Sequence, residues 1–234
     1  MTAISASGMT LRARHVLPMG GKPIENGWLR IVGGRIVAVG RREPPGPVHD
    51  LGAAIILPGL VNAHTHLEFS DLASPLAGEG GLPGWIARIV QLRRNRPADD
   101  SAAQRIGSSI AAGLRESAAA GVTAIGEIAT AVLPAAYRAQ GPRVRVYREA
   151  LGLAATAVEA ARAAAARDLD RLTAAGLAAG ISPHAPYSVA AELGKAILQA
   201  ACRRRLPAAM HLAESEAEAE FVLHGTGPFR RLLE

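Results

Sequence analysis

The sequence predicts an α/β protein of parallel βα units, preceded by a small all-β segment. From residue 58 onward, short apolar segments alternate with amphipathic or alanine-rich segments, as expected for strands that alternate with helices. Before residue 58, short β-type segments are separated instead by glycine and proline. We therefore expect two domains, residues 1–57 and residues 58–234.

The first domain is expected to contain a β-hairpin. Its strands are residues 29–32 and 35–39, and Gly33 and Gly34 join them. Glycine tolerates the positive φ angles that a tight hairpin turn requires. Residues 43–47 include three prolines and are expected to form a loop. This domain is too short to bury a large core by itself.

Five apolar segments of the second domain are expected to be strands. They are residues 60–66, 122–128, 143–151, 177–183 and 208–212. Helices are expected from Ser101 to near Gly121, over residues 157–175 and over residues 190–204. In the first helix, Ser101 and Gln104 have the spacing of a capping box. Its apolar stripe is Ile106, Ile110 and Leu114.

Histidines follow several of these apolar segments. Residues 57–66 end in His64 and His66, which point to the same face of a strand because side chains alternate along it. His184 and His211 also lie where apolar segments end. Parallel βα units gather such strand ends at one rim, so the four residues predict a metal site. The alternative for the first pair is two ordinary histidines, one buried and one solvated.

Charge and composition argue against binding to nucleic acid. The net charge is +6, but the arginine clusters, residues 93–96 and 203–205, are small, and no aromatic residue lies among them. We read these clusters as solvated helix ends and expect no nucleic-acid partner.

Other sequence features indicate a cytoplasmic protein. The single cysteine, Cys202, excludes a disulfide framework within the chain and is compatible with a reducing compartment. Residues 1–10 do not have the basic start and apolar core of a secretory signal. No apolar run reaches about 18 residues, so no membrane span is expected.

Three motifs, in order along the chain, resemble those of one family. Residues 58–66 resemble the first-strand signature of the amidohydrolase superfamily. Residues 182–188 and 211–214 resemble the fourth- and fifth-strand motifs of its nucleobase deaminase and chlorohydrolase branch. The similarity extends from about Met9 to the last residue. It implies a TIM-type (β/α) barrel with about five βα units present, and an N-terminal β domain that is half of a composite β-sandwich.

The resemblance also implies roles for the residues of the motifs. His64, His66 and His211 would be metal ligands, and Glu214 the residue that transfers protons. A divalent ion lowers the pKa of bound water towards 7, which gives a hydroxide nucleophile at neutral pH. A nearby carboxylate can then move a proton to a ring nitrogen. The alternative for Glu214 is an acidic residue at a helix N-terminus, stabilised by the helix dipole.

Two further residues are candidates for substrate binding. The resemblance implies that His184 contacts substrate. The alternative is a loop histidine that only packs. Glu68, two residues beyond the histidine pair, is a specificity residue if it faces the pocket, and a solvated loop carboxylate if it does not. Trp85 is either part of a lid or a core anchor.

The sequence favours a site with one metal ion. Branches of the family with two metals commonly bridge them through a carboxylated lysine on the fourth strand, whereas Lys22 and Lys195 are the only lysines here and neither ends a strand. The expected cofactor is one divalent ion, zinc, with iron as the alternative because histidine suits both.

The expected reaction is hydrolytic deamination of an aminopurine, a cytosine-like base or a related nucleoside. The partner would be a small heteroaromatic amine, and the full-length protein could form a homo-oligomer. One alternative is dechlorination of a triazine. A third possibility is a non-catalytic truncated fragment, because the histidine and aspartate that the family carries on its sixth and eighth strands have no counterpart. We expect the sequence to be part of a longer protein.

Overall fold

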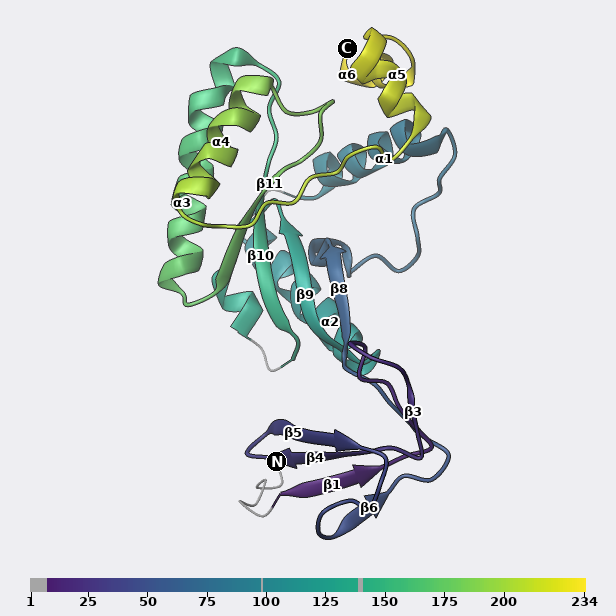
Figure 1. The fold of residues 1–234 in the computed structure, drawn as a ribbon. Helices are drawn as coiled ribbons and strands as arrows, with labels where there is room; N and C mark the ends of the chain where they lie inside the picture. Colours follow the sequence, from purple (N-terminus) through teal and green to yellow (C-terminus); the bar gives the residue numbers. More distant parts are fainter. Residues whose placement is uncertain (1–7, 98, 139–140) are drawn as a thin grey trace. The chain divides into compact units, whose positions relative to one another are not determined.

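The computed structural model describes residues 8–97, 99–138 and 141–234 (Figure 1). The chain divides into two compact units, Met1–Gly59 and Leu60–Glu234. Within the described residues, no helix is both long enough and apolar enough to cross a membrane.

The first unit is all-β, as the sequence predicts. One sheet has the strand order β5-β4-β1-β6, in which β1 pairs antiparallel with β4 and parallel with β6. These strands are β1 (Met9–Arg12), β4 (Trp28–Val32), β5 (Arg35–Gly40) and β6 (Val48–Asp50). A smaller sheet, in the order β3-β2-β7, is formed by β2 (His15–Val16), β3 (Ile24–Glu25) and β7 (Ile55–Ile56).

The hairpin expected in this unit is confirmed. Strands β4 and β5 pair antiparallel from Trp28 opposite Gly40 to Val32 opposite Arg35. The two residues between them, Gly33 and Gly34, have φ angles of 57° and 75°. Positive φ at both central positions matches the right-handed twist of the strands, which explains two consecutive glycines here.

The second unit contains a four-stranded parallel sheet in the order β11-β10-β9-β8. Its strands are β8 (Leu60–Thr65), β9 (Val122–Ala129), β10 (Arg143–Ala150) and β11 (Ala178–Pro183). The helices that connect or follow these strands are α2 (Ala102–Ala119), α3 (Val158–Ala174) and α4 (Ala191–Arg203) (Figure 1). This order of elements confirms a partial (β/α) barrel.

Further helices lie in the connections of the second unit. They are α1 (Gly81–Asn95), α5 (Glu216–His224) and α6 (Pro228–Leu233), with short 3₁₀ turns η1 (Leu67–Phe69), η2 (Pro134–Arg138) and η3 (Ala155–Ala157). Helix α1 lies in the connection between β8 and α2, after η1. The sequence pattern did not predict α1.

The core lies between the sheet and its helices. Ile110 and Leu114, two members of the predicted stripe on α2, are almost fully buried, and Ile106 packs against them. Val146 of β10 and Leu193 of α4 belong to the same cluster. Burial contributes about 1.5–3 kcal/mol for each large aliphatic side chain, so this cluster stabilises the packing of the helices against the sheet.

The fifth predicted strand, residues 208–212, is wrong as a regular strand. This segment is extended and runs parallel to β11, but it forms only an isolated bridge between Ile181 and Ala208. The backbone of Ala209 donates to Ile181, at 3.0 Å from N to O. The next donor along β11 would be Pro183, which has no N–H, so the ladder stops there.

The predicted capping box at Ser101 is also wrong. Ser101 precedes α2, but its side chain makes no cap hydrogen bond. Its hydroxyl instead donates to the carboxylate of Asp99, at 2.7 Å between the two oxygens. Ser101 has the φ and ψ angles of a helical residue (−85° and −6°), and its backbone N–H donates to the carboxylate of Asp99, so Asp99 takes the place of the expected cap.

Candidate metal centre

Three of the predicted histidines converge at the carboxyl end of the sheet. His64 is in β8, His66 follows it, and His211 lies in the extended segment beside β11. One ring nitrogen from each lies within 4.8 Å of the others. The ring centroid of His64 is 5.3 Å from that of His66 and 4.5 Å from that of His211. Rings carried at the two edges of the sheet, by β8 and by the segment beside β11, therefore come together at its carboxyl end.

The electrostatics of the site favour neutral imidazoles at His64 and His66. Burial, followed by the charge of His211, lowers the pKa of His66 to about 3. The same two causes lower the pKa of His64. Two buried ring nitrogens, Nδ1 of His66 and Nε2 of His211, have no hydrogen-bond partner among the described residues. Neutral rings with unused nitrogens are the form in which histidine binds a metal ion, so this donor set fits the metal site that the sequence predicts.

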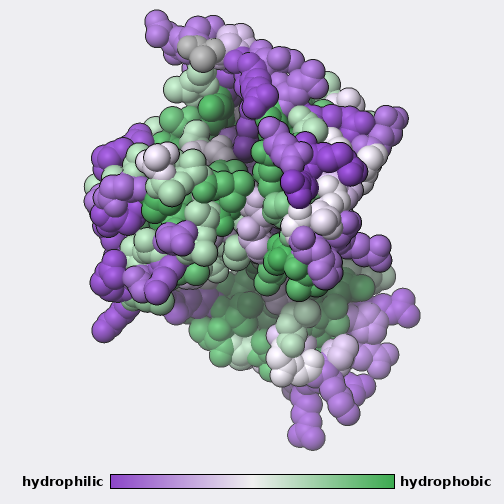
Figure 2. Space-filling view, turned by 90° about the horizontal axis from the view of Figure 1, so that it is seen from above, coloured by the Kyte–Doolittle hydropathy of each residue, from purple (hydrophilic) through white to green (hydrophobic). Residues whose placement is uncertain are grey.

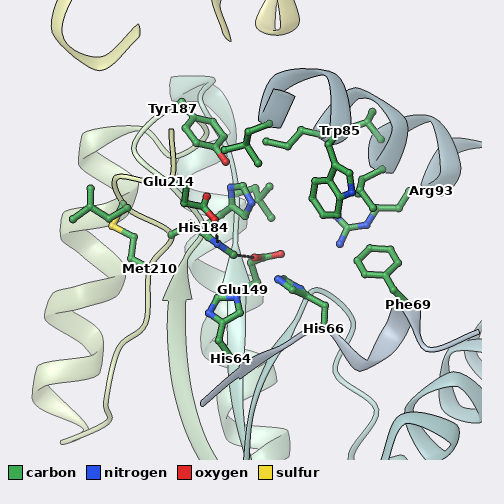
Figure 3. A pocket seen from close by; sticks show the side chains of 17 residues that line it. His64, His66, Phe69, Trp85, Arg93, Glu149, His184, Tyr187, Met210 and Glu214 are labelled. Atoms are coloured by element: carbon green, nitrogen blue, oxygen red, sulfur yellow. Dashed lines mark hydrogen bonds and ion pairs between the residues drawn. The ribbon is translucent and has the colours of Figure 1, made fainter. Parts of the chain in front are cut away.

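A cavity of about 490 Å³ opens in front of the histidines. Figure 2 looks onto this end of the second unit, where hydrophobic residues surround a hollow and hydrophilic residues gather at the periphery. One wall is the inner side of α1, with Leu82, Trp85, Ile86, Ile89 and Val90. On the opposite wall are His184, Tyr187, Met210 and Glu214 (Figure 3). Trp85 lines this cavity and is 37% exposed, so it is not a core anchor.

Glu214 lies on the cavity wall beside His211. Its Oε1 is 3.2 Å from Nδ1 of His211. Helix α5 begins two residues later, and its N-cap is Ser215, whose hydroxyl accepts from the backbone of Glu218. Glu214 therefore precedes the helix, and the structure brings its carboxylate to the histidine cluster.

His184 lies between the histidine cluster and Tyr187. Its ring centroid is 5.0 Å from that of His211, and its Nδ1 is 2.5 Å from the hydroxyl oxygen of Ser188. Burial, together with His211, lowers the pKa of His184 to about 4. The ring lines the cavity, so the structure brings this candidate to the predicted position.

Glu68 does not line the cavity, and it is not a solvated loop carboxylate either. It is 7% exposed. Its carboxylate accepts hydrogen bonds from Arg93 at 2.5 Å and from the hydroxyl of Thr130 at 2.7 Å. Arg93 comes from α1, lines the cavity, and places its guanidinium 5.1 Å from the ring centroid of Phe69. Glu68 thus holds a cation, Arg93, which Figure 3 shows on the α1 side of the cavity.

The sequence reasoning missed two acidic residues at the carboxyl ends of central strands. Glu149 of β10 lines the cavity, is 1% exposed, and has Oε1 at 3.9 Å from Nε2 of His211. Burial raises its pKa to about 7. Glu127 of β9 lies behind the histidine pair and accepts from the backbone of Leu67. Both follow the strand-end rule that identified the histidines, so the rule applied to carboxylates would have found them.

A partial (β/α) barrel with a histidine cluster at the carboxyl ends of its strands is the architecture of a metal-dependent hydrolase. Residues 55–233 match the model of the amidohydrolase family, and the chain belongs to this family.

The chain is similar to several deaminases and to a chlorohydrolase. It is 31% identical over 222 residues to an aminodeoxyfutalosine deaminase from Deinococcus radiodurans, a match that covers 90% of this chain and 50% of the relative. A crystal structure of Helicobacter pylori aminofutalosine deaminase with methylthio-coformycin aligns with a TM-score of 0.76 at 21% identity, covering 94% of this chain and 55% of that one.

A mutant of atrazine chlorohydrolase from Arthrobacter aurescens, complexed with zinc and atraton, aligns with a TM-score of 0.74 at 19% identity, covering 96% of this chain and 57% of the other. Both structural matches show a shared fold. The chain spans about half the length of the curated relatives that it matches over most of its own length.

Proposed function

We propose that this chain carries the metal centre of a hydrolytic deaminase that removes ammonia from an aminopurine, a cytosine-like base or a related nucleoside. The observation that carries the proposal is the convergence of His64, His66 and His211 beside Glu214, at the carboxyl end of a parallel sheet. The deaminase relatives named above support the same reaction type.

The proposed cofactor is one zinc ion held by the three histidines, with iron as the alternative. Three histidine ligands that leave a further position open are typical of catalytic zinc. When bound, the ion supplies the Lewis-acid chemistry that makes water nucleophilic at neutral pH. The zinc in the structure of the chlorohydrolase supports this choice.

The residues of the chain have separate proposed roles. Glu214 takes a proton from water and delivers it to a ring nitrogen, which makes the amino-bearing carbon more electrophilic. His184 donates or accepts a hydrogen bond at the substrate. Arg93, held by the carboxylate of Glu68, contributes a cation to the same cavity wall.

The cavity supports a flat heteroaromatic substrate. Its volume of about 490 Å³ is within the range of small-ligand sites. The apolar side chains of α1 offer a surface for the faces of a ring, while the histidines and Glu214 offer polar groups to its edge. Trp85 and Tyr187 are aromatic side chains on opposite walls, and Phe69 also lines the cavity.

A second candidate function is hydrolytic dechlorination of a triazine. The structural similarity to the atrazine chlorohydrolase favours it, because the same water-activating chemistry serves a different leaving group. The leaving group is the measurable difference between the two candidates.

The test has two parts. We expect the purified chain, stripped with a chelator and then titrated with zinc, to bind one ion per chain. The longest protein that contains this chain should then be assayed for ammonia release from adenosine, methylthioadenosine and cytosine, and for chloride release from a chlorotriazine. Zinc-dependent ammonia release supports deamination, and chloride release without ammonia favours the second candidate. Failure to bind zinc and, in a parallel titration, Fe²⁺ would overturn both.

A further inference from the structure

Glu218 is a buried carboxylate that the proposed chemistry does not use. It lies in the first turn of α5 and is 2% exposed. Its Oε1 accepts from the backbone N–H of Ala213 at 3.2 Å, and its Oε2 accepts from that of Glu214 at 2.7 Å. Both oxygens therefore bind the backbone of the turn that leads from His211 to Glu214.

These bonds differ from those of an ordinary capping box. In a capping box, the acidic residue at the third helical position accepts from the N–H of the N-cap residue. The first half of that pattern is present, because the N–H of Glu218 donates to Ser215 Oγ at 3.2 Å. The carboxylate, however, passes over Ser215 and binds the two preceding residues. One half of the motif starts the helix, and the other half fixes the turn.

The turn needs such support because its backbone is unfavourable. Ala213 has a φ angle of 59°, in the left-handed region that residues with a Cβ rarely adopt. At the other end of the turn, the backbone of His211 donates to the carbonyl of His184 at 2.8 Å. The turn is therefore held by the residue that follows β11 on one side and by Glu218 on the other.

We propose that Glu218 is a positioning residue, which holds the turn from His211 to Glu214 so that both side chains face the cavity. The inference rests on the proposed function, in which His211 is a metal ligand and Glu214 transfers protons. If the two bonds to Glu218 are lost, the turn can relax from the left-handed conformation. The separation of 3.2 Å between the two side chains, Nδ1 to Oε1, would then no longer be fixed.

Three variants separate this role from simple helix capping. Glu218→Gln keeps the shape but leaves one acceptor oxygen, since the amide nitrogen cannot accept from a backbone N–H. Ser215→Ala removes the helix cap and leaves both bonds from the carboxylate to the turn. Glu216→Gln removes one negative charge from an exposed position on the same helix.

Three measurements on the 234-residue chain test the proposal. Amide hydrogen exchange, followed by NMR, reports whether the N–H groups of Ala213 and Glu214 are protected. Titration with Co²⁺, followed by its visible absorption, reports metal affinity. Thermal unfolding of each variant measures the loss of stability. A role in helix capping alone would lower stability without changing metal affinity.

We expect Glu218→Gln to speed exchange at Ala213 and Glu214 and to weaken Co²⁺ binding by roughly 10- to 100-fold, the usual effect of losing a residue that orients a ligand. Ser215→Ala should lower the melting temperature by at least as much as Glu218→Gln does, without changing Co²⁺ affinity. Glu216→Gln should change neither the melting temperature nor the Co²⁺ affinity.

Equal loss of affinity in Glu218→Gln and Ser215→Ala would overturn the proposal, as would unchanged exchange at Ala213 and Glu214. If the unaltered chain binds no Co²⁺, the metal centre of the proposed function fails, and the exchange rates alone decide whether Glu218 holds the turn.

Discussion

Glu127 accepts a hydrogen bond from the backbone N–H of Leu67, with 2.9 Å between Oε2 and the nitrogen. Glu127 belongs to β9, and Leu67 directly follows His66, so a buried carboxyl group fixes the chain where it leaves β8. Glu127 is 1% exposed, and burial raises its pKa to about 8. The histidine pair is therefore anchored by a group that is costly to ionise.

The first prediction is a pH dependence of stability that depends on Glu127. The folded chain retains its proton up to about pH 8, whereas the unfolded chain releases it near the ordinary pKa of 4.5. The contribution of Glu127 to the free energy of unfolding is therefore complete below pH 4.5 and falls as the pH rises towards 8, by up to about 1.4 kcal/mol per pH unit. Glu127→Gln lacks this titration.

Urea unfolding of both chains between pH 4.5 and 9, with a chelator present, measures the difference. The free energy of unfolding of Glu127→Gln, relative to that of the parent, should rise up to about pH 8 and then stay level. Taking the difference between the chains cancels the titration of the histidines. Parallel curves would show that Glu127 does not titrate across this window.

The second prediction concerns the spacing between β8 and β9. A Cβ at Gly126 would collide with the backbone carbonyl of Ala63, the residue before His64. Gly126→Ala should push β8 away from β9, destabilise the second unit by more than about 1 kcal/mol and weaken zinc binding.

The matched control is Gly107→Ala, because a Cβ at Gly107 in α2 meets nothing within 4 Å. Alanine is the better helix former, so this variant should gain roughly 0.5–1 kcal/mol and keep the zinc affinity of the parent. Chemical unfolding and calorimetric zinc titration measure both effects. Equal zinc affinity in the two variants would contradict the proposed link between strand spacing and the metal centre.

Much of the fold could be predicted because the sequence pattern is local. The four strands of the second unit end where apolar segments stop, and the buried positions of α2 follow its helical stripe. Since parallel strands end at one rim, the same reasoning predicted that His64, His66 and His211 would meet. Their roles as ligands remain predictions, because they rest on the family motifs and on geometry.

What the pattern could not predict depends on contacts between distant segments. Residues 208–212 have the apolar character of a strand, but Pro183 of the neighbouring strand cannot donate the next hydrogen bond. Helix α1 begins after Gly80, whose φ angle is 79°, and it has no side-chain cap to mark its start. Without α1, the sequence offered no partner for Glu68, so the ion pair with Arg93 could not be foreseen.

The third prediction separates coordination from other effects of removing a histidine. His211→Ala should abolish tight zinc binding. His64 and His66, at the end of β8, are the other two proposed ligands, and two ligands alone would not hold the ion tightly. His224→Ala removes an exposed histidine of α5 and should leave zinc binding unchanged. Metal analysis after dialysis against a weak chelator gives the zinc content of each. Full zinc retention by His211→Ala would exclude it from the metal centre.

The last prediction concerns proton transfer by Glu214, measured in the longest protein that contains this chain. Glu214→Gln keeps the shape of the side chain but cannot take a proton from water. Deamination should therefore fall by roughly two to four orders of magnitude, the usual effect of removing a general acid or base. Zinc content should stay near that of the parent, because Glu214 is not a proposed ligand, whereas His211→Ala should lose both zinc and activity. If Glu214→Gln kept full activity with zinc bound, the carboxylate at 3.2 Å from His211 would have no part in proton transfer, and its role would be limited to contact with that ring.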